Sequence, residues 1–212
     1  MIEYLRQKLF SPTHIHSLIF VRIAFGLIMF CEITKFFHLD LTHYYYIDPE
    51  FHFKYYGFEW VKPVSEELFI LLFNALGILA IFIALGLFYK TSTFLFLIGF
   101  TYIFLLDKAL YLNHYYMIIL FNFILLFMPA NRYLSVDAAY INPRIKTKTI
   151  ASWPVILLRI QMEIILIYAG LVKVNADWLS FYPLKIWFAQ QGDLFNNIWM
   201  VSIASYGSIL LH

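Results

Sequence analysis

The stretch "TSTFLFLIGFTYIFLLDKALYLNHYYMIILFNFILLFM" (residues 91–128) is almost unbroken apolar sequence, and its length decides how the chain folds. A membrane-spanning helix needs about 20 mainly apolar residues, within a range of about 17 to 25. The stretch is too long for one such helix. Its polar interruption is the segment "DKALYLNH" (107–114), which contributes Asp107, Lys108, Asn113 and His114. We therefore predict a helical hairpin that crosses a membrane twice and turns at this segment.

The composition of the whole chain supports a membrane protein. Of its 212 residues, 62% are hydrophobic, 21% are aromatic and only 13% are charged. Soluble domains carry about 25% charged residues, so this chain could not cover its apolar surface in water. The net charge of +2 and the lack of a basic stripe argue against a nucleic-acid partner. A single cysteine, Cys31, excludes an internal disulfide.

Further candidate spans lie outside the hairpin, near residues 16–37, 68–88 and 153–173. A final run, 198–211, is apolar but short, which leaves open an incomplete span and a chain truncated at its C-terminal end. The fold class we predict is an all-α integral membrane protein, a multi-span helical bundle of about five to six transmembrane helices.

Basic residues between the spans predict the orientation, because cytoplasmic loops are enriched in lysine and arginine. Arg6 and Lys8 precede the first span, Lys90 follows the second, and four basic residues lie in the 130–152 loop. This pattern puts the N-terminus in the cytoplasm. The 38–67 loop, the 107–114 turn and the end of the fifth span are then expected on the opposite, non-cytoplasmic face.

Ionisable residues inside the fifth span share one helical face. Arg159, Glu163 and Lys173 recur at helical spacing, and the first two are one turn apart and can pair. Such residues mark functional cavities or join helices by hydrogen bonds. The second reading is favoured for Arg22, Asn74 and Asn122, each taken singly. A transporter would fit the polar face, but no pair of Gly/Pro-broken helices supports one.

Lys173 and His114 each allow two interpretations. A lysine at the end of a span usually reaches for the membrane surface. If an apolar pocket holds it instead, desolvation favours a neutral amine, which can take a proton from a phenol. A histidine at a turn is more often a surface residue than a catalytic one. The histidines lack zinc-ligand spacing, so we predict no metal site.

The loop "HLDLTHYYYIDPEFHFKYYGFEW" (38–60) holds nine aromatic residues and three histidines. Aromatic side chains of this kind gather at the membrane–water interface. The loop is therefore expected to lie on the membrane surface as an aromatic belt, or equally to form a wall of a hydrophobic ligand site.

Three motifs carry a resemblance to a known family: "FLLDKALYLNHYYM" (104–117), "MPANRYLSVDAAY" (128–140) and "YAGLVKVNADWLSFY" (168–182). Together and in this order they resemble the vitamin K-dependent gamma-glutamyl carboxylase family and, more broadly, the horizontally transferred transmembrane (HTTM) domain. The similarity begins near residue 11. It implies a cytoplasmic N-terminal segment (1–10) and an HTTM-like transmembrane domain (11–212).

The resemblance implies an enzyme whose co-substrates are reduced vitamin K or another quinol, oxygen and carbon dioxide. A lysine amine deprotonates the quinol, and oxygen addition then yields a base strong enough to remove a glutamate γ-proton. The resulting carbanion takes up carbon dioxide, and the quinone leaves as its epoxide. The expected partners are membrane lipids, a lipid-soluble quinone and a glutamate-containing peptide.

Motif alignment implies roles for individual residues. Lys173 matches the base of the family, and His114 matches the residue of the proton-abstraction step. Asn113 would orient His114 or an oxygen-bearing intermediate. The residues expected to support the quinone pocket are Asp107, Lys108, Arg159, Glu163, Asp177 and Trp178.

The chain departs from the family at two motif positions and in its extent. Val172 stands where the family often has a second lysine, and Asn175 where it can carry aspartate. Family carboxylases also continue into a large β-rich extramembrane domain. Two alternatives to a carboxylase therefore stay open: a quinol epoxidase without protein carboxylation, and a non-catalytic module that binds lipid or quinone.

Overall fold

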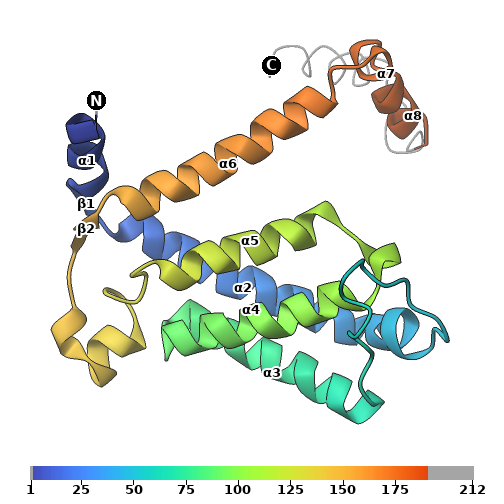
Figure 1. Ribbon diagram of the computed structural model, residues 1–212, viewed down its shortest axis with the longest axis horizontal. Coiled ribbons are helices and arrows are strands. Elements are labelled where there is room, and N and C mark those ends of the chain that lie inside the picture. The colour runs from blue at the N-terminus through green and yellow to red at the C-terminus, as the bar shows by residue number, and fades with distance from the viewer. Residues whose placement is uncertain (1, 191–212) are drawn as a thin grey trace. The chain divides into compact units, whose positions relative to one another are not determined.

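The computed structural model describes residues 2–190 and divides at Leu158/Arg159 into two units (Figure 1). Unit 1 contains five α-helices: α1 (Ile2–Phe10), α2 (His16–His38), α3 (Glu66–Leu85), α4 (Tyr89–Leu106) and α5 (Asn113–Phe127). Its short elements are β1 (Pro12–His14), η1 (His43–Ile47), η2 (Lys108–Leu110), η3 (Asp137–Ile141), η4 (Pro143–Ile145) and β2 (Thr149–Ala151). The helix α6 (Trp153–Val172) crosses the division, and α7 (Ala176–Leu179) and α8 (Tyr182–Gln190) follow in unit 2.

The helices confirm an all-α, multi-span membrane protein. Among the described residues, α2, α3, α4 and α6 are long and apolar enough to cross a membrane. The predicted hairpin is confirmed as α4 and α5, joined by residues 107–112. At 15 residues α5 is apolar but shorter than these four candidate spans, so the second crossing of the hairpin stays a prediction. The candidate span at 198–211 lies outside the described residues.

In unit 1, α2 packs on α3, α3 on α4, and α4 on α5 (Figure 1). Small residues allow α2 and α3 to approach closely at Gly26. A Cβ atom added there would lie 2.6 Å from both the carbonyl oxygen of Ala80 and the backbone nitrogen of Ala84. Small side chains at such contacts are typical of helix pairs in membranes, where van der Waals packing drives association.

A short antiparallel sheet, which the sequence reading did not predict, joins the N-terminus to the segment before α6. Thr13 of β1 lies opposite Ile150 of β2. The hydroxyl of Ser152 donates to the Lys8 carbonyl beside it. Three-residue strands carry too little hydrophobic alternation to be recognised from sequence.

A buried cluster around Asp137 closes the end of unit 1 where α4 begins. The Asp137 carboxylate accepts hydrogen bonds from the backbone N–H groups of Phe88 (2.8 Å) and Tyr89 (3.0 Å). It also accepts one from Nδ2 of Asn131 (2.8 Å). Asp137 thereby satisfies two backbone donors at the start of α4, which have no partner within the helix.

Arg22 fastens α2 to the same end. Its guanidinium is fully buried and donates to the carbonyl oxygens of Ala130 (2.8 Å) and Leu134 (2.7 Å). This geometry agrees with the favoured reading of Arg22 as a residue that joins elements. Asn122 likewise reaches from α5 to the Thr93 carbonyl of α4 at 3.3 Å.

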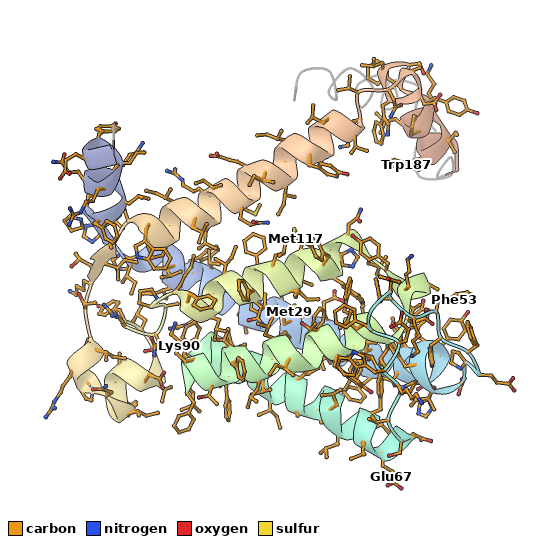
Figure 2. All side chains as sticks on the ribbon, viewed as in Figure 1. Met29, Phe53, Glu67, Lys90, Met117 and Trp187 are labelled. Atoms are coloured by element: carbon orange, nitrogen blue, oxygen red, sulfur yellow. The ribbon has the colours of Figure 1, made fainter. Side chains whose placement is uncertain are left out.

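Two other polar side chains of the spans bond to backbone carbonyls, Asn74 within its own helix and Lys90 across to the end of α5. Asn74 differs from Arg22 and Asn122 because it bonds to the Ile70 carbonyl of its own helix. Lys90 donates to the carbonyls of Leu126 and Met128 at the end of α5 (Figure 2). Lysine side chains commonly satisfy the last carbonyl groups of a helix in this way.

Candidate functional site

The 39–65 loop and the 107–112 turn meet at the other end of unit 1. The backbone N–H of Lys108 donates to the Phe53 carbonyl at 2.7 Å. The ammonium of Lys54 donates to the Leu106 carbonyl at 3.2 Å. These bonds confirm that the loop and the turn share one end of the bundle.

Asp107 is the centre of this junction. Its buried carboxylate accepts from the backbone N–H groups of Ala109 (2.8 Å) and Phe53 (3.2 Å). Its other oxygen lies 3.1 Å from Nδ1 of His52, which is also buried. Because an ionised carboxylate only accepts hydrogen bonds, this network assigns the proton to Nδ1. Asp107 therefore orients the His52 ring, and its expected role in supporting a quinone pocket stays a prediction.

His114 lies at the start of α5 and lines a cavity of about 380 Å³, here called the His114 cavity. The predicted residue Asn113 precedes it and is exposed. The cavity also contains Lys35 at the end of α2. Its remaining wall is largely aromatic, with the rings of Phe36, Tyr45, Tyr46, Tyr111 and Tyr115. The loop thus contributes aromatic side chains to a ligand-sized cavity, one of the two expectations for it.

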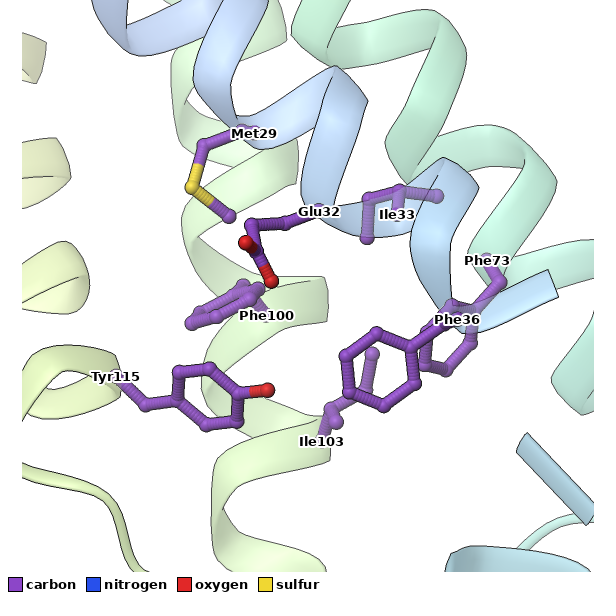
Figure 3. A pocket seen from close by; sticks show the side chains of 8 residues that line it. All are labelled: Met29, Glu32, Ile33, Phe36, Phe73, Phe100, Ile103 and Tyr115. Carbon is purple, nitrogen blue, oxygen red and sulfur yellow. The ribbon is translucent and has the colours of Figure 1, made fainter. Parts of the chain in front are cut away.

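A smaller space of about 10 Å³ lies deeper in the bundle and shares Phe36 and Tyr115 with the His114 cavity. Figure 3 shows the Glu32 carboxylate and the Tyr115 hydroxyl pointing into it. Glu32 forms an ion pair of 2.5 Å with Lys35. The volume is about that of a single water molecule, so this space offers no room for a ligand.

Tyr46 lies between two cavities, because it lines both the His114 cavity and a second one of about 780 Å³. It is only 4% exposed. Burial raises the pKa of its phenol well above the ordinary range, and the charge of Asp107 acts in the same direction. The Tyr46 side chain is therefore a neutral hydroxyl in the wall between the two cavities.

In unit 2 the structure brings the predicted residues Lys173 and Trp178 together. The ammonium of Lys173 lies 5.1 Å from the centre of the Trp178 ring, a cation–π contact. Asn175 fixes the intervening turn: its side-chain oxygen accepts from the backbone N–H of Trp178 at 3.0 Å. This cap starts α7, whose first turn contains Asp177.

The remaining predicted residues lie on α6 and in unit 1. Arg159 and Glu163 lie one turn apart on α6, yet they form no ion pair with each other in this part of the described chain. Lys108 is exposed on the 107–112 turn. His114 belongs to unit 1 and Lys173 to unit 2. Each unit is described by itself, so their joint action stays a prediction.

The sequence does not single out His52 as a site residue. Its partner Asp107 is 55 positions away. No periodicity links a loop residue to a turn at that distance. The available signal was the aromatic loop itself, which could line a ligand site.

Comparison with known families gives a match to the HTTM domain over residues 10–212. The chain belongs to the HTTM domain family. HTTM domains are found in vitamin K-dependent carboxylase-related proteins, which agrees with the resemblance of the three motifs. No solved structure matches this HTTM protein.

Proposed function

We propose that this HTTM protein is a membrane-embedded, vitamin K-dependent gamma-carboxylase-like enzyme, or its membrane core. It couples oxygen-dependent epoxidation of reduced vitamin K, or of another quinol, to the carboxylation of glutamate. The observation that carries the proposal is the position of His114 at the aromatic-lined cavity beside the 107–112 turn.

The side chains of the cavity suit a quinol. Ligand pockets are commonly about 300–1,000 Å³, mostly apolar, with a few polar groups that fix orientation. The His114 cavity, at about 380 Å³, has aromatic walls that can stack on a ring, and two side chains with nitrogen atoms, Lys35 and His114. A bound quinol supplies the electrons that activate oxygen, and carbon dioxide is the group transferred to glutamate.

The residues of the chain bind, orient and move protons. Lys173 is the base that accepts the proton of a quinol hydroxyl, and the face of the Trp178 ring, whose centre lies 5.1 Å from the Lys173 ammonium, stabilises the cation. His114 serves in the proton abstraction from glutamate, and Asn113 orients it. Asp107 fixes the turn that carries both. Asp177, Lys108, Arg159 and Glu163 are assigned a supporting role.

The experiment measures epoxide and labelled peptide with the protein in lipid nanodiscs. It supplies reduced vitamin K, oxygen and labelled bicarbonate, with and without a glutamate peptide. Lys173→Ala is expected to reduce epoxide formation by roughly 100-fold to 10,000-fold, the usual contribution of a general base. The matched control is Lys185→Ala, which removes an exposed lysine from α8 in the same unit and should leave the rate unchanged.

Three outcomes would overturn the proposal in distinct ways. Full epoxidation by folded Lys173→Ala protein would disprove the assignment of the base. Epoxide without label in the peptide would leave a quinol epoxidase. Saturable quinol binding without any product would identify a non-catalytic binding module.

A further inference from the structure

A cavity of about 550 Å³, here called the Lys90 cavity, lies at the end of unit 1 where α4 begins. Its wall is formed by the start of α4, the end of α5 and the segment that follows α5. Two of its side chains are cationic, Lys90 and Arg132, and one is anionic, Asp137. The lining therefore carries one net positive charge. Nothing in the proposed quinol chemistry uses these side chains.

The protein itself already engages the negative charge of the lining. The Asp137 carboxylate accepts from the backbone N–H groups of Phe88 and Tyr89 and from the side chain of Asn131. It is 7% exposed, so a ligand in the cavity has little access to it. The lining therefore presents its cationic side chains rather than its carboxylate.

Both cationic side chains have hydrogen-bond donors left for a ligand. Lys90 uses two of its three donors on the carbonyl oxygens of Leu126 and Met128, which fix its ammonium beside the end of α5. Within residues 2–190, the hydrogen bonds from arginine side chains come from Arg22, and the Arg132 guanidinium forms no ion pair. The planar fork of a guanidinium matches two oxygens of a phosphate group.

Apolar side chains adjoin these donors in the same lining. Phe88, Phe127 and Ile141 all line the cavity and are 57%, 60% and 48% exposed. Phe88 directly precedes α4 and Phe127 is the last residue of α5, so both lie at the level where headgroups and acyl chains meet. A free phosphate ion leaves these three side chains uncovered, whereas the acyl chains of a phospholipid cover them.

The loop beside the cavity adds positive charge outside it. Three further basic residues, Arg144, Lys146 and Lys148, follow in the sequence and are exposed. No acidic residue lies between residues 138 and 152. Clusters of this kind next to a membrane attract anionic lipids, which are concentrated in the cytoplasmic leaflet. The 130–152 loop is predicted to face the cytoplasm, so its charge supports an anionic lipid as the ligand.

We propose that the Lys90 cavity binds the phosphodiester headgroup of an anionic phospholipid, with Arg132 and Lys90 donating to the phosphate oxygens. The single negative charge of phosphatidylglycerol matches the one net positive charge of the lining. Phosphatidylcholine carries the same phosphodiester, but its quaternary ammonium cancels that charge and is repelled by the two cations. The site lies wholly in unit 1 and does not depend on the quinol chemistry.

The test counts lipids bound to the full chain by native mass spectrometry. The protein in neutral detergent micelles is titrated with phosphatidylglycerol, or with phosphatidylcholine of the same acyl chains. We expect phosphatidylglycerol to bind at least about 10-fold more tightly, the usual effect of a charge-assisted hydrogen bond. Inorganic phosphate, at the ionic strength of a sodium chloride control, should not displace it.

Two matched variants separate the cavity from the loop around it. Arg132→Gln removes no hydrogen bond of the described residues and should lower the preference for phosphatidylglycerol at least about 5-fold. Arg132→Lys should retain most of the preference, because it keeps the charge. Arg144→Gln removes an exposed arginine of the same loop that does not line the cavity, and it should leave the preference nearly intact.

A second measurement does not depend on the folding of variants. Arginines of the unmodified protein are labelled with phenylglyoxal and quantified by mass spectrometry, in nanodiscs of phosphatidylglycerol and of phosphatidylcholine. Phosphatidylglycerol should protect Arg132 more than phosphatidylcholine does. Arg144 in the same sample is the internal control and should react equally in both lipids.

Three outcomes would overturn the lipid site. An equal loss of preference in Arg132→Gln and Arg144→Gln, or equal protection of both arginines, would show a general attraction of the basic loop. Displacement of phosphatidylglycerol by inorganic phosphate would identify a site for free phosphate. Equal binding of the two lipids would show that the charge of the cavity does not select its ligand.

Discussion

Two aspartates stabilise the opposite ends of the unit 1 bundle through the same arrangement of hydrogen bonds. Asp137 accepts from two backbone N–H groups and from the side chain of Asn131. Asp107 accepts from two backbone N–H groups and from the side chain of His52. Both carboxylates are 7% exposed. The third donor is therefore what distinguishes the two ends.

We call the Asp137 end the structural end and the Asp107 end, where the His114 cavity lies, the reactive end. An asparagine amide cannot titrate, and the neighbouring Arg22 is fully buried against backbone carbonyls. A histidine held through Nδ1 still presents Nε2, and His52 presents it to a cavity. A capping aspartate thus fixes the turn at both ends, and Asp107 also orients an ionisable ring.

The largest expected effect is the loss of stability when Asp137→Ala removes the hydrogen bonds of the structural end. This change leaves three donors without an acceptor, two of them at the start of α4. Unsatisfied buried donors cost about 1–3 kcal/mol each, so we expect the free energy of unfolding to fall by about 4 kcal/mol. Titration with SDS in mixed micelles measures it. A loss below about 1 kcal/mol would mean that water replaces the carboxylate.

Two glycines, one at each end of the bundle, should differ next most in the stability that is lost when alanine replaces them. Gly86 ends α3 at φ 65°, and a Cβ there would lie 2.5 Å from Cβ of Ser135. Gly57 has φ 82° with no neighbour within 4 Å of such a Cβ. Gly86→Ala combines backbone strain with overpacking, and we expect a loss of about 3 kcal/mol. Gly57→Ala is the matched control and should lose only about 1 kcal/mol.

The same micelle titration compares the two glycine variants. Equal losses would show that the Gly86 turn can move away from Ser135. The cluster at the structural end would then be less rigid than its hydrogen bonds indicate.

A smaller change in stability, with a change in the tautomer of His52, is expected for Asp107→Asn. The asparagine can still accept from the backbone, but its amide can donate to Nδ1 of His52, so the ring proton moves to Nε2. We expect a stability loss of about 1–2 kcal/mol and a reversed tautomer, measured from the ring nitrogen chemical shifts. Asp137→Asn is the control: a similar stability loss with the tautomer of His52 unchanged. If Asp107→Asn leaves the tautomer unchanged, Asp107 does not set it.

The sequence could predict the spans better than the junctions. In a membrane, an apolar run of about 20 residues can form few structures other than a spanning helix, because every backbone polar group must be satisfied internally. The polar break at 107–114 therefore located the turn between α4 and α5. The pairing of His52 with Asp107, and the capping of α4 by Asp137, join residues 55 and 48–49 positions apart. Such contacts depend on which loops meet, which no local pattern encodes.

Among the predicted site residues, too, a local contact could be predicted better than a long-range one. Lys173 and Trp178 meet because one turn and the Asn175 cap separate them, a local arrangement. The functional pairing of Lys173 with His114 is long-range and came from resemblance and charge bias. It stays a prediction, and the Lys173→Ala experiment tests it.

The smallest expected effect is a pH dependence confined to the exposed 57–59 turn of the reactive end. The Gly57 backbone N–H donates to the Glu59 carboxylate at 3.0 Å and lowers the pKa of Glu59; the backbone N–H of Glu59 itself acts in the same direction. A lowered folded-state pKa means that the turn is stabilised at neutral pH, where the carboxylate is ionised in both states. That stabilisation disappears as the pH falls through the folded-state pKa.

Hydrogen exchange of the Gly57 amide in nanodiscs measures this effect. After correction for the intrinsic exchange rate, protection should decrease between about pH 5 and pH 3, and Glu59→Gln should remove the pH dependence. The stability of the whole protein should not change, because the turn is solvent-exposed and touches neither aspartate cluster. A change in the unfolding midpoint of Glu59→Gln would show that this turn is coupled to the Asp107 junction, so that the reactive end responds to surface charge.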